Sequence, residues 1–381
     1  MDQRIQAQGP LRGVKVVEFV GLGPAPFCAM LLSDLGADVV RIDRPGALGG
    51  GAAEVLARGR RSIGLNLKKR EAVDTCIELL KQADILLEGY RPGVMERLGL
   101  GPDVALEANP KLVYGRMTGW GQHGPLAHAA GHDLNYIALT GALGAIGPKE
   151  KPVPPLNVVG DFGGGSLYLA VGVLAALHHA KATGEGQVVD AAIVDGATHL
   201  MAAIHQLSAM GMWGGARGEN LLDGGAPFYD CYACADGEFV SIAPLEPEFF
   251  ALLIEKLGLG DHPAMKNQYD ASTWPEMRTA FEETFRSKTR AEWCELLEGT
   301  DACFAPVLSP AEARDHAHMA ARGAFEDVDG VSQSAPAPRF SRTPGAIQGA
   351  GPKPGGDTEA ALADWGFDAK AIARLRDAGA I

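Results

Sequence analysis

The sequence contains little cysteine and no excess of positive charge. Six of its 381 residues are cysteines, which are too few for a disulfide framework. The one CxxC pair, Cys231 and Cys234, has no second pair or neighbouring histidine, so we interpret it as two small side chains buried on a strand. With 34 Lys and Arg against 47 Asp and Glu, the formal net charge is −13. This balance disfavours nucleic acid or a membrane surface as the main binding partner.

Export and membrane signals are also absent. The first residues, MDQRIQAQGPLRG, are polar and lack the apolar core of a secretion signal. We expect no apolar run of transmembrane length, and the C-terminal DAGAI matches no anchor or peroxisomal signal. A cytoplasmic protein is therefore expected. At 46% hydrophobic and 21% charged residues, the chain can bury a sizeable core in two or three domains.

Two common nucleotide motifs are missing as well. No Walker loop is present, which disfavours ATP hydrolysis. The turn GLGPAP, residues 21–26, begins like a dinucleotide fingerprint, but Pro26 stands where the third small residue belongs. Binding of NAD or FAD through this turn is not expected.

The N-terminal part alternates β-branched runs with helical periodicity. Strands are predicted at residues 14–20, 37–45, 61–67, 84–90 and 111–117, and helices at 27–37 and 68–83. This alternation predicts an α/β protein with a parallel sheet. Ligands of such sheets bind in the loops that follow the strands.

The remainder of the chain predicts further helices and a smaller unit. Two apolar helices, at residues 132–147 and 160–184, flank a Pro-rich loop, and the second is apolar almost all round, which predicts burial. A composition change at residues 211–225 predicts a linker. A smaller α+β unit should follow at 226–306, with a hairpin around Asp236 and Gly237, and a helical tail at 358–379 closes the chain.

Two short segments contain residues suited to proton transfer. The segment AGHDLNYIALTG begins an apolar helix with His132 and Asp133, and a histidine of ordinary pKa, about 6.5, is a natural base near neutral pH. Asp133 either caps its own helix or orients the imidazole. Asp161 lies near a second helix start, before Gly163, Gly164 and Gly165. An N-cap would explain the aspartate, but it would not explain three glycines in a first turn.

Cations concentrate near the predicted strand ends. The run RGRRSIGLNLKKR, residues 58–70, is joined there by Arg44, Arg91 and Arg97. These side chains form either a solvated charged face or a site for a phosphate-rich ligand, because arginine binds phosphate in bidentate fashion.

Seven motifs in order resemble one family over nearly the whole chain. The motifs are GPLRGVKVVEFVGLGPAPFCAMLLSDLGADVVRIDRP, RRSIGLNLK, LLEGYRPGVMERLGLG, RMTGWGQHGP, GHDLNYIALTG, LNVVGDFGGG and GQVVDAAIVDG. On these motifs the chain resembles the family III CoA-transferases, and within them the branch that racemises α-methylacyl-CoA.

The resemblance implies a particular architecture. It implies an interlocked homodimer in which each chain has a Rossmann-like large domain and a small α+β domain. The large domain would comprise residues 1–210 and be completed by 331–381. The small domain would span 226–306, with connections at 211–225 and 307–330. The active site would lie between the large domain of one subunit and the small domain of its partner.

The resemblance also implies site residues. His132 and Asp161 match the two bases, Glu246 matches a small-domain carboxylate paired with the histidine, and Asp133 and Asn157 match supporting polar residues. Contacts to CoA are implied for five residues, namely Arg44, Leu65, Lys68, Arg91 and Arg97. No metal or redox cofactor is implied, since CoA enters as part of the substrate.

Racemisation next to a thioester needs one base on each face of the carbon. We therefore predict interconversion of (2R)- and (2S)-2-methylacyl-CoA through an enolate, whose oxyanion would accept from free N–H groups at the helix start of Asp161. CoA transfer with Asp161 as nucleophile is the alternative, although such transferases generally lack the histidine of the GHD motif. An acyl-CoA-binding scaffold without catalysis is a third possibility. Met201, Met210 and Met212 either line an adaptable acyl surface or belong to the core.

Overall fold

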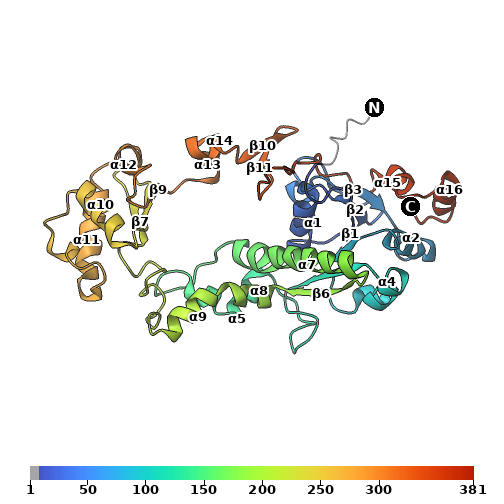
Figure 1. The fold of residues 1–381 in the computed structure, drawn as a ribbon, viewed down its shortest axis with the longest axis horizontal. Coiled ribbons are helices and arrows are strands. Elements are labelled where there is room, and N and C mark those ends of the chain that lie inside the picture. Colours follow the sequence, from blue (N-terminus) through green and yellow to red (C-terminus); the bar gives the residue numbers. More distant parts are fainter. Residues whose placement is uncertain (1–7) are drawn as a thin grey trace. The chain divides into compact units, whose positions relative to one another are not determined.

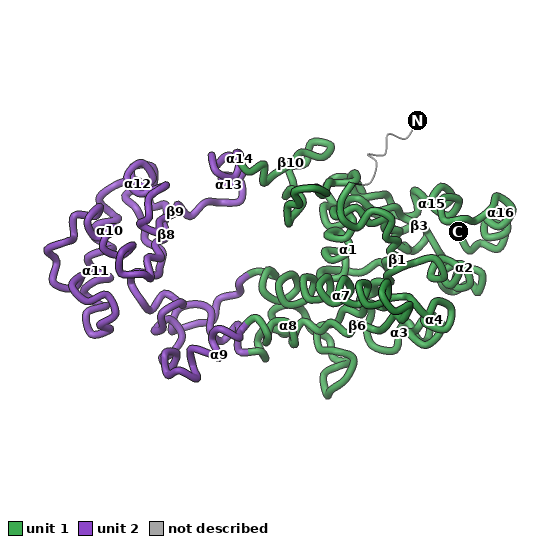
Figure 2. The backbone as a smooth tube through the Cα atoms, in the orientation of Figure 1, with its two compact units in different colours: residues 1–140, 156–200, 322–381 green, residues 141–155, 201–321 purple. Residues whose placement is uncertain are grey.

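The computed structural model describes residues 8–381, whose contacts divide into two compact units (Figure 2). Unit 1 contains the described residues up to 140, 156–200 and 322–381, and unit 2 contains 141–155 and 201–321. The sequence-based division placed 1–210 and 331–381 in one domain. The contacts instead group 141–155 and 201–210 with unit 2, and 322–330 with unit 1.

Unit 1 is built on a six-stranded parallel sheet with the order β3-β2-β1-β4-β5-β6 (Figure 1). The predicted α/β class is therefore confirmed. The first strands are almost continuously buried because a parallel sheet is covered on both faces. The strands are β1 Lys15–Phe19, β2 Asp38–Asp43, β3 Arg61–Gly64, β4 Ile85–Glu88, β5 Val113–Thr118 and β6 Gln187–Ala192.

Helices cover both faces of this sheet. Alternate residues of β1 point to opposite faces, so Val17 and Phe19 belong to one hydrophobic cluster and Val16 belongs to the other. The first cluster is closed by α2, α4, α15 and α16, and the second by α1 and α7. The helices of unit 1 are α1 Pro24–Asp34, η1 Val55–Ala57, α2 Arg70–Leu80, α3 Val94–Arg97, α4 Pro102–Ala108, α5 Asp133–Leu139, η2 Val158–Ser166, α7 Leu167–Thr183, α8 Ile193–Leu200, α15 Thr358–Asp364 and α16 Ala369–Asp377.

The C-terminal tail packs beside β3. Ser62 N donates to Asp357 Oδ2 at 2.9 Å, and Gly64 N donates to Thr358 Oγ1 at 2.9 Å. The indole of Trp365 is buried in the cluster that faces α2. The tail forms two helices, α15 and α16, because the chain turns at Gly366 with φ 90°. A short hairpin precedes them, comprising β10 Phe325–Val328 and β11 Val331–Ser334.

The segment η2–α7 corrects two expectations. Val158–Thr183 is long and apolar enough to cross a membrane by length and composition, although we expected no such run. Buried core helices of soluble proteins meet the same criterion, and Leu169 and Val173 pack against the sheet. Only part of the helix is buried, however, because Val171 is 68% exposed in the single chain.

Unit 2 surrounds the three-stranded antiparallel sheet β7-β8-β9. The predicted hairpin is confirmed, since Gly237 turns the chain between β7 and β8 with φ 81°. Its core packs aromatic rings from β7 and α11, including Tyr232 stacked on Phe285 at 5.3 Å between ring centroids. The elements are α6 Ala142–Ala145, α9 Ala202–Ala209, β7 Asp230–Ala233, β8 Phe239–Ile242, α10 Pro247–Leu257, η3 Pro263–Met265, η4 Ala271–Thr273, α11 Trp274–Phe285, α12 Arg290–Leu297, β9 Phe304–Pro306, α13 Pro310–Asp315 and α14 Ala317–Ala321.

The Gly-rich segment 211–225 is held by hydrogen bonds. The Arg217 guanidinium donates to the carbonyl oxygens of Gly144, Pro148 and Lys149 at 2.8–3.0 Å. Asn220 is buried, and its amide donates to Asp223 Oδ2 at 2.7 Å. Met210 and Met212 are 61% and 53% exposed, so neither belongs to the core of the chain.

Candidate active site

The strand order reverses between β1 and β4, and a cavity lies next to this switch point, at the carboxyl ends of β4 and β5. Loops that leave neighbouring strands in opposite directions open a crevice at the carboxyl end of a parallel sheet. The cavity has a volume of about 350 Å³. It is lined by residues 89–92 after β4, 117–120 at the end of β5, and segment 127–136, so Arg91 and His132 share its wall.

His132 occupies the position before the first turn of α5. Its backbone is extended, its N–H donates to Asn135 Oδ1 at 3.1 Å, and Asn135 N donates to the His132 carbonyl at 2.8 Å. These reciprocal bonds fix the start of the helix. A side chain at Gly131 would collide with the rings of Tyr136 and Trp120. Glycine is therefore required directly before the histidine.

Asp133 joins the two candidate segments. Its Oδ1 accepts from the backbone N–H of Asp161 at 2.7 Å, across 28 residues of sequence. A Cβ at Gly160 would lie 2.3 Å from that oxygen, which explains the glycine before Asp161. The carboxylate was expected to cap its own helix or to orient the imidazole. Instead, it accepts a hydrogen bond from the segment that carries Asp161, and this bond brings Asp161 close to His132.

Asp161 is half-buried on η2, a π-helix that continues into α7. Short π segments occur often at functional sites. Burial raises the pKa of the Asp161 carboxyl, and the charge of Asp133 raises it further. A hydrogen bond from Asn157 and the charge of His132 act in the opposite direction and lower this pKa. A carboxyl with a raised pKa can both accept and deliver a proton closer to neutral pH.

Two N–H groups on η2, those of Asp161 and Phe162, are already engaged, which restricts one expectation. Asp161 N donates to Asp133, and Phe162 N donates to the Asn157 carbonyl at 3.2 Å. The N–H of Asp161 is therefore not available for an oxyanion. Among residues 8–381, the N–H groups of Asp133 and Leu134 at the start of α5 have no hydrogen-bond acceptor.

The three glycines after Asp161 serve close backbone packing. A Cβ at Gly164 would lie 2.7 Å from Ala197 N on α8, and one at Gly165 would lie 3.1–3.2 Å from side-chain atoms of Ile193 and Pro24. Gly164 and Gly165 therefore allow α8 and α1 to approach η2 closely.

Two residues at the site were missed by sequence reasoning. A Cβ at Gly23, where φ is 68°, would lie 3.2 Å from Asp161 Oδ2. The GLGPAP turn was interpreted only as a possible dinucleotide motif. The signal that could have identified Gly23 was its position directly before Pro24. Tyr136 lines the cavity, and its pKa is raised by burial and by the charge of Asp161. Its position one helical turn after His132 was the signal.

The cation cluster separates into two groups. Arg58, Arg60 and Arg61 form internal ion pairs with Asp34, Glu18 and Asp38, so they do not support the phosphate interpretation. Four other cations are exposed and form no ion pair within the described residues, namely Arg44, Lys68, Arg91 and Arg97. Leu65 is 2% exposed and packs in the core, so only its backbone could reach a ligand.

Glu246 lies in unit 2, where it precedes α10 and is exposed. Four of the five predicted catalytic residues therefore lie in unit 1, namely His132, Asp133, Asn157 and Asp161. The fifth, Glu246, belongs to unit 2. The CxxC pair also lies in unit 2. Cys234 is buried as predicted, whereas Cys231 is exposed, and residues 8–381 contain no group of three potential metal ligands.

Taken together, the sheet order and the switch-point cavity define an α/β protein with an acid–base site and a neighbouring group of unpaired cations. The sequence profile of CoA-transferase family III matches residues 11–358, and the chain belongs to this family.

Two curated relatives and one solved structure refine this placement. The chain is 46% identical over 369 residues to α-methylacyl-CoA racemase of Mus musculus, covering 96% of each chain. It is 45% identical over 371 residues to α-methylacyl-CoA racemase of Homo sapiens, again covering 96% of each. The fold matches the crystal structure of a CaiB/BaiF family protein from Brucella suis with a TM-score of 0.81 and 25% identity, covering 94% of this chain and 100% of that chain.

Proposed function

We propose that this protein racemises 2-methylacyl-CoA thioesters by a two-base mechanism, and the similarity to two α-methylacyl-CoA racemases over 96% of the chain supports this activity. One structural observation carries the mechanism. The bond from Asp161 N to Asp133 Oδ1 holds a histidine and a carboxyl of raised pKa in one site.

In the proposed reaction, one base removes the α-proton and the C–H electron pair forms the enolate. The other residue, in its protonated form, then delivers a proton to the opposite face, which inverts the carbon. Starting from the other epimer, the two residues exchange roles. The enolate oxygen needs hydrogen-bond donors, and we assign this role to the free N–H groups of Asp133 and Leu134 beside His132.

We assign the unpaired cations to the CoA part of the substrate. Arg91 lines the same cavity as His132, and Arg97 follows on the short helix α3. Phosphate and diphosphate groups of CoA are the kind of anion that guanidinium groups bind. CoA enters as part of the substrate, so the proposal includes no separate cofactor.

We further propose an interlocked homodimer, in which Glu246 of one chain supports His132 of the other. The observation behind it is the apolar surface of η2–α7, where Val158, Leu167 and Val171 are 57%, 48% and 68% exposed in the single chain. Exposed apolar patches of this kind are typical of subunit interfaces.

Mixed dimers test the shared site directly. His132→Ala and Glu246→Gln chains, each inactive alone, are co-expressed with different tags and purified as the mixed dimer. If His132 and Glu246 come from different chains, one of the two sites keeps both native residues and activity returns. A mixed dimer without activity would show that both residues of a site belong to one chain.

The activity itself is tested by incubating each epimer of a 2-methylacyl-CoA with the protein in deuterium oxide. We expect α-deuteration by mass spectrometry and inversion by chiral analysis. Inversion should be lost in His132→Ala and in Asp161→Asn, and each variant should lose α-deuteration of the epimer whose proton the missing base removes. Transfer of CoA to an added free acid that depends on Asp161 alone, with no deuteration, would instead identify a CoA-transferase.

A further inference from the structure

The first turn of α1, residues 23–26, contacts the segment that carries Asp161. Ser166 is fully buried at the end of η2, and its Oγ lies 2.7 Å from the Pro24 carbonyl and 3.0 Å from the Asp161 carbonyl. Its single hydroxyl proton is shared between these two acceptors. Gly23 packs against the Asp161 carboxylate, and Phe27 stacks on Phe162 at 4.5 Å between ring centroids.

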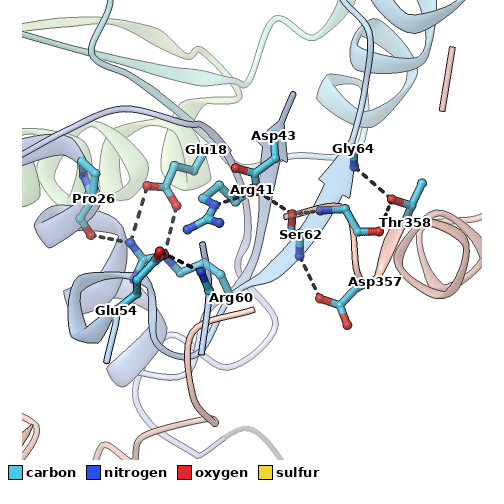
Figure 3. A network of polar contacts seen from close by, with 12 residues as sticks. Glu18, Pro26, Arg41, Asp43, Glu54, Arg60, Ser62, Gly64, Asp357 and Thr358 are labelled. Carbon is cyan, nitrogen blue, oxygen red and sulfur yellow. Dashed lines mark hydrogen bonds and ion pairs between the residues drawn. The ribbon is translucent and has the colours of Figure 1, made fainter. Parts of the chain in front are cut away.

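A buried ion pair holds the same turn from the side of the sheet (Figure 3). The Nε atom of Arg60 donates to Glu18 Oε2 at 3.0 Å, and its Nη2 donates to the Pro26 carbonyl at 2.6 Å. The side chains of Glu18 and Arg60 are both 0% exposed. The turn is therefore fixed at Pro24 by Ser166 and at Pro26 by Arg60.

Stability alone does not account for this arrangement. Burying a charged pair costs desolvation that the attraction between the charges often fails to offset, and apolar residues of similar volume are frequently as stable. The carbonyls of a first helical turn are already acceptors within the helix. Ser166 and Arg60 use the second lone pair of two such carbonyls, and the Ser166 hydroxyl also lies within hydrogen-bond distance of the Asp161 carbonyl.

We propose that Ser166 is a positioning residue for Asp161, and that it anchors the Asp161 backbone to a turn of α1 that the Glu18–Arg60 pair holds in place. This inference rests on the proposed function, because the position of the carboxylate matters only if Asp161 transfers a proton. A 1 Å displacement of a catalytic group can cost on the order of a hundredfold in rate.

The two-base mechanism provides a readout that separates positioning from general stability. Exchange of the α-proton is measured in deuterium oxide, starting from each epimer separately. Asp161→Asn identifies the epimer whose proton Asp161 removes. Ser166→Ala is expected to slow exchange of that epimer about tenfold and exchange of the other less than about twofold. The control is Ser33→Ala, which removes an equally buried hydroxyl bonded to the Gly59 carbonyl at the other end of α1.

The outcomes are distinct. Equal loss for both epimers, or a Ser33→Ala variant that shows the same one-sided loss, would overturn the positioning role. Wild-type protein that exchanges neither epimer would overturn the proposed function and this inference with it.

The ion pair is tested by the double variant Glu18→Met with Arg60→Met, because Arg60→Met alone leaves a buried carboxylate without its partner. Unfolding measurements establish that the double variant is folded. We expect this variant, like Ser166→Ala, to slow exchange of the epimer whose proton Asp161 removes and to leave exchange of the other epimer nearly unchanged. Wild-type exchange of both epimers in the folded double variant would exclude a role for the pair.

Discussion

Replacing Gly23 with alanine is expected to impair both the fold and the proton transfer, for separate reasons. Gly23 has φ 68° and ψ −115°, a conformation that residues with a side chain rarely adopt. Forcing alanine into such a region costs ~1–3 kcal/mol in the free energy of unfolding. The new methyl group would lie 3.2 Å from Asp161 Oδ2 and 3.7 Å from its Cγ.

The second effect follows from that short distance. A Cβ–oxygen separation of 3.2 Å is tighter than ordinary van der Waals contact, so the carboxylate must shift by a few tenths of an ångström. Because catalytic groups are sensitive to displacements of this size, we expect α-proton exchange by Asp161 to fall roughly three- to tenfold. Exchange of the epimer whose proton His132 removes should change less.

Both quantities are measurable on one preparation. Chemical denaturation gives the free energy of unfolding, and deuterium exchange from each epimer gives the two proton-transfer rates. Gly13→Ala is the control, because Gly13 also has a positive φ, of 88°, but an added Cβ meets no atom within 4 Å. If Gly23→Ala were destabilised while exchange by Asp161 remained at the wild-type rate, the geometry assigned to this contact would be incorrect.

Three further predictions concern charge. Asp133→Asn keeps the acceptor for Asp161 N but removes a negative charge that raises the pKa of Asp161. The acidic limb of the pH–rate profile should therefore move to lower pH. A limb that stays in place or moves to higher pH would contradict this prediction. Asp161→Asn should raise the melting temperature at pH 7 while abolishing racemisation, since a pKa raised in the folded state makes the carboxylate costly to ionise there. That gain should fade below about pH 4, where the aspartate is protonated even in the unfolded chain, and a lower melting temperature at pH 7 would count against it. Arg97→Ala should weaken CoA binding and reduce the salt dependence of that binding in calorimetric titrations. Arg61→Ala removes a cation that is paired with Asp38, so it should leave CoA affinity within about twofold. Equal effects of both variants would contradict the division of the cations into paired and unpaired groups.

Sequence reasoning located the first five strands of the large sheet because short apolar stretches there alternate with turn residues and with helical periodicity. It could not give their order, which depends on how the crossovers pack. The hairpin of β10 and β11 was missed because its residues, FEDVDGVSQS, lack a clear apolar alternation. The helix α7 was expected to be buried all round, but packing against the sheet covers only one face of it.

The candidate site was predictable only in part. His132 and Asp161 were recognisable from residue type and local glycines. The function of Asp133 was not, because its acceptor role depends on a backbone N–H 28 residues away. The same limit applies to the arginines. The sequence does not distinguish Arg60 from Arg91. Only the position of Glu18 in the fold shows that Arg60 forms an internal ion pair, whereas Arg91 is exposed.

The position of the C-terminal tail beside β3 has a consequence for the order of events during synthesis. Ser62 bonds to Asp357 across 295 residues, and Trp365 and Leu362 cover apolar side chains of the first strands and helices. At translation rates of 5–20 residues per second, that interval takes roughly 15–60 s. Unit 2 is fully synthesised by residue 321, before the last segment of unit 1 exists. The half of the sheet that emerges first from the ribosome is thus the last to be closed, and until then it is the surface on which a nascent-chain chaperone would act.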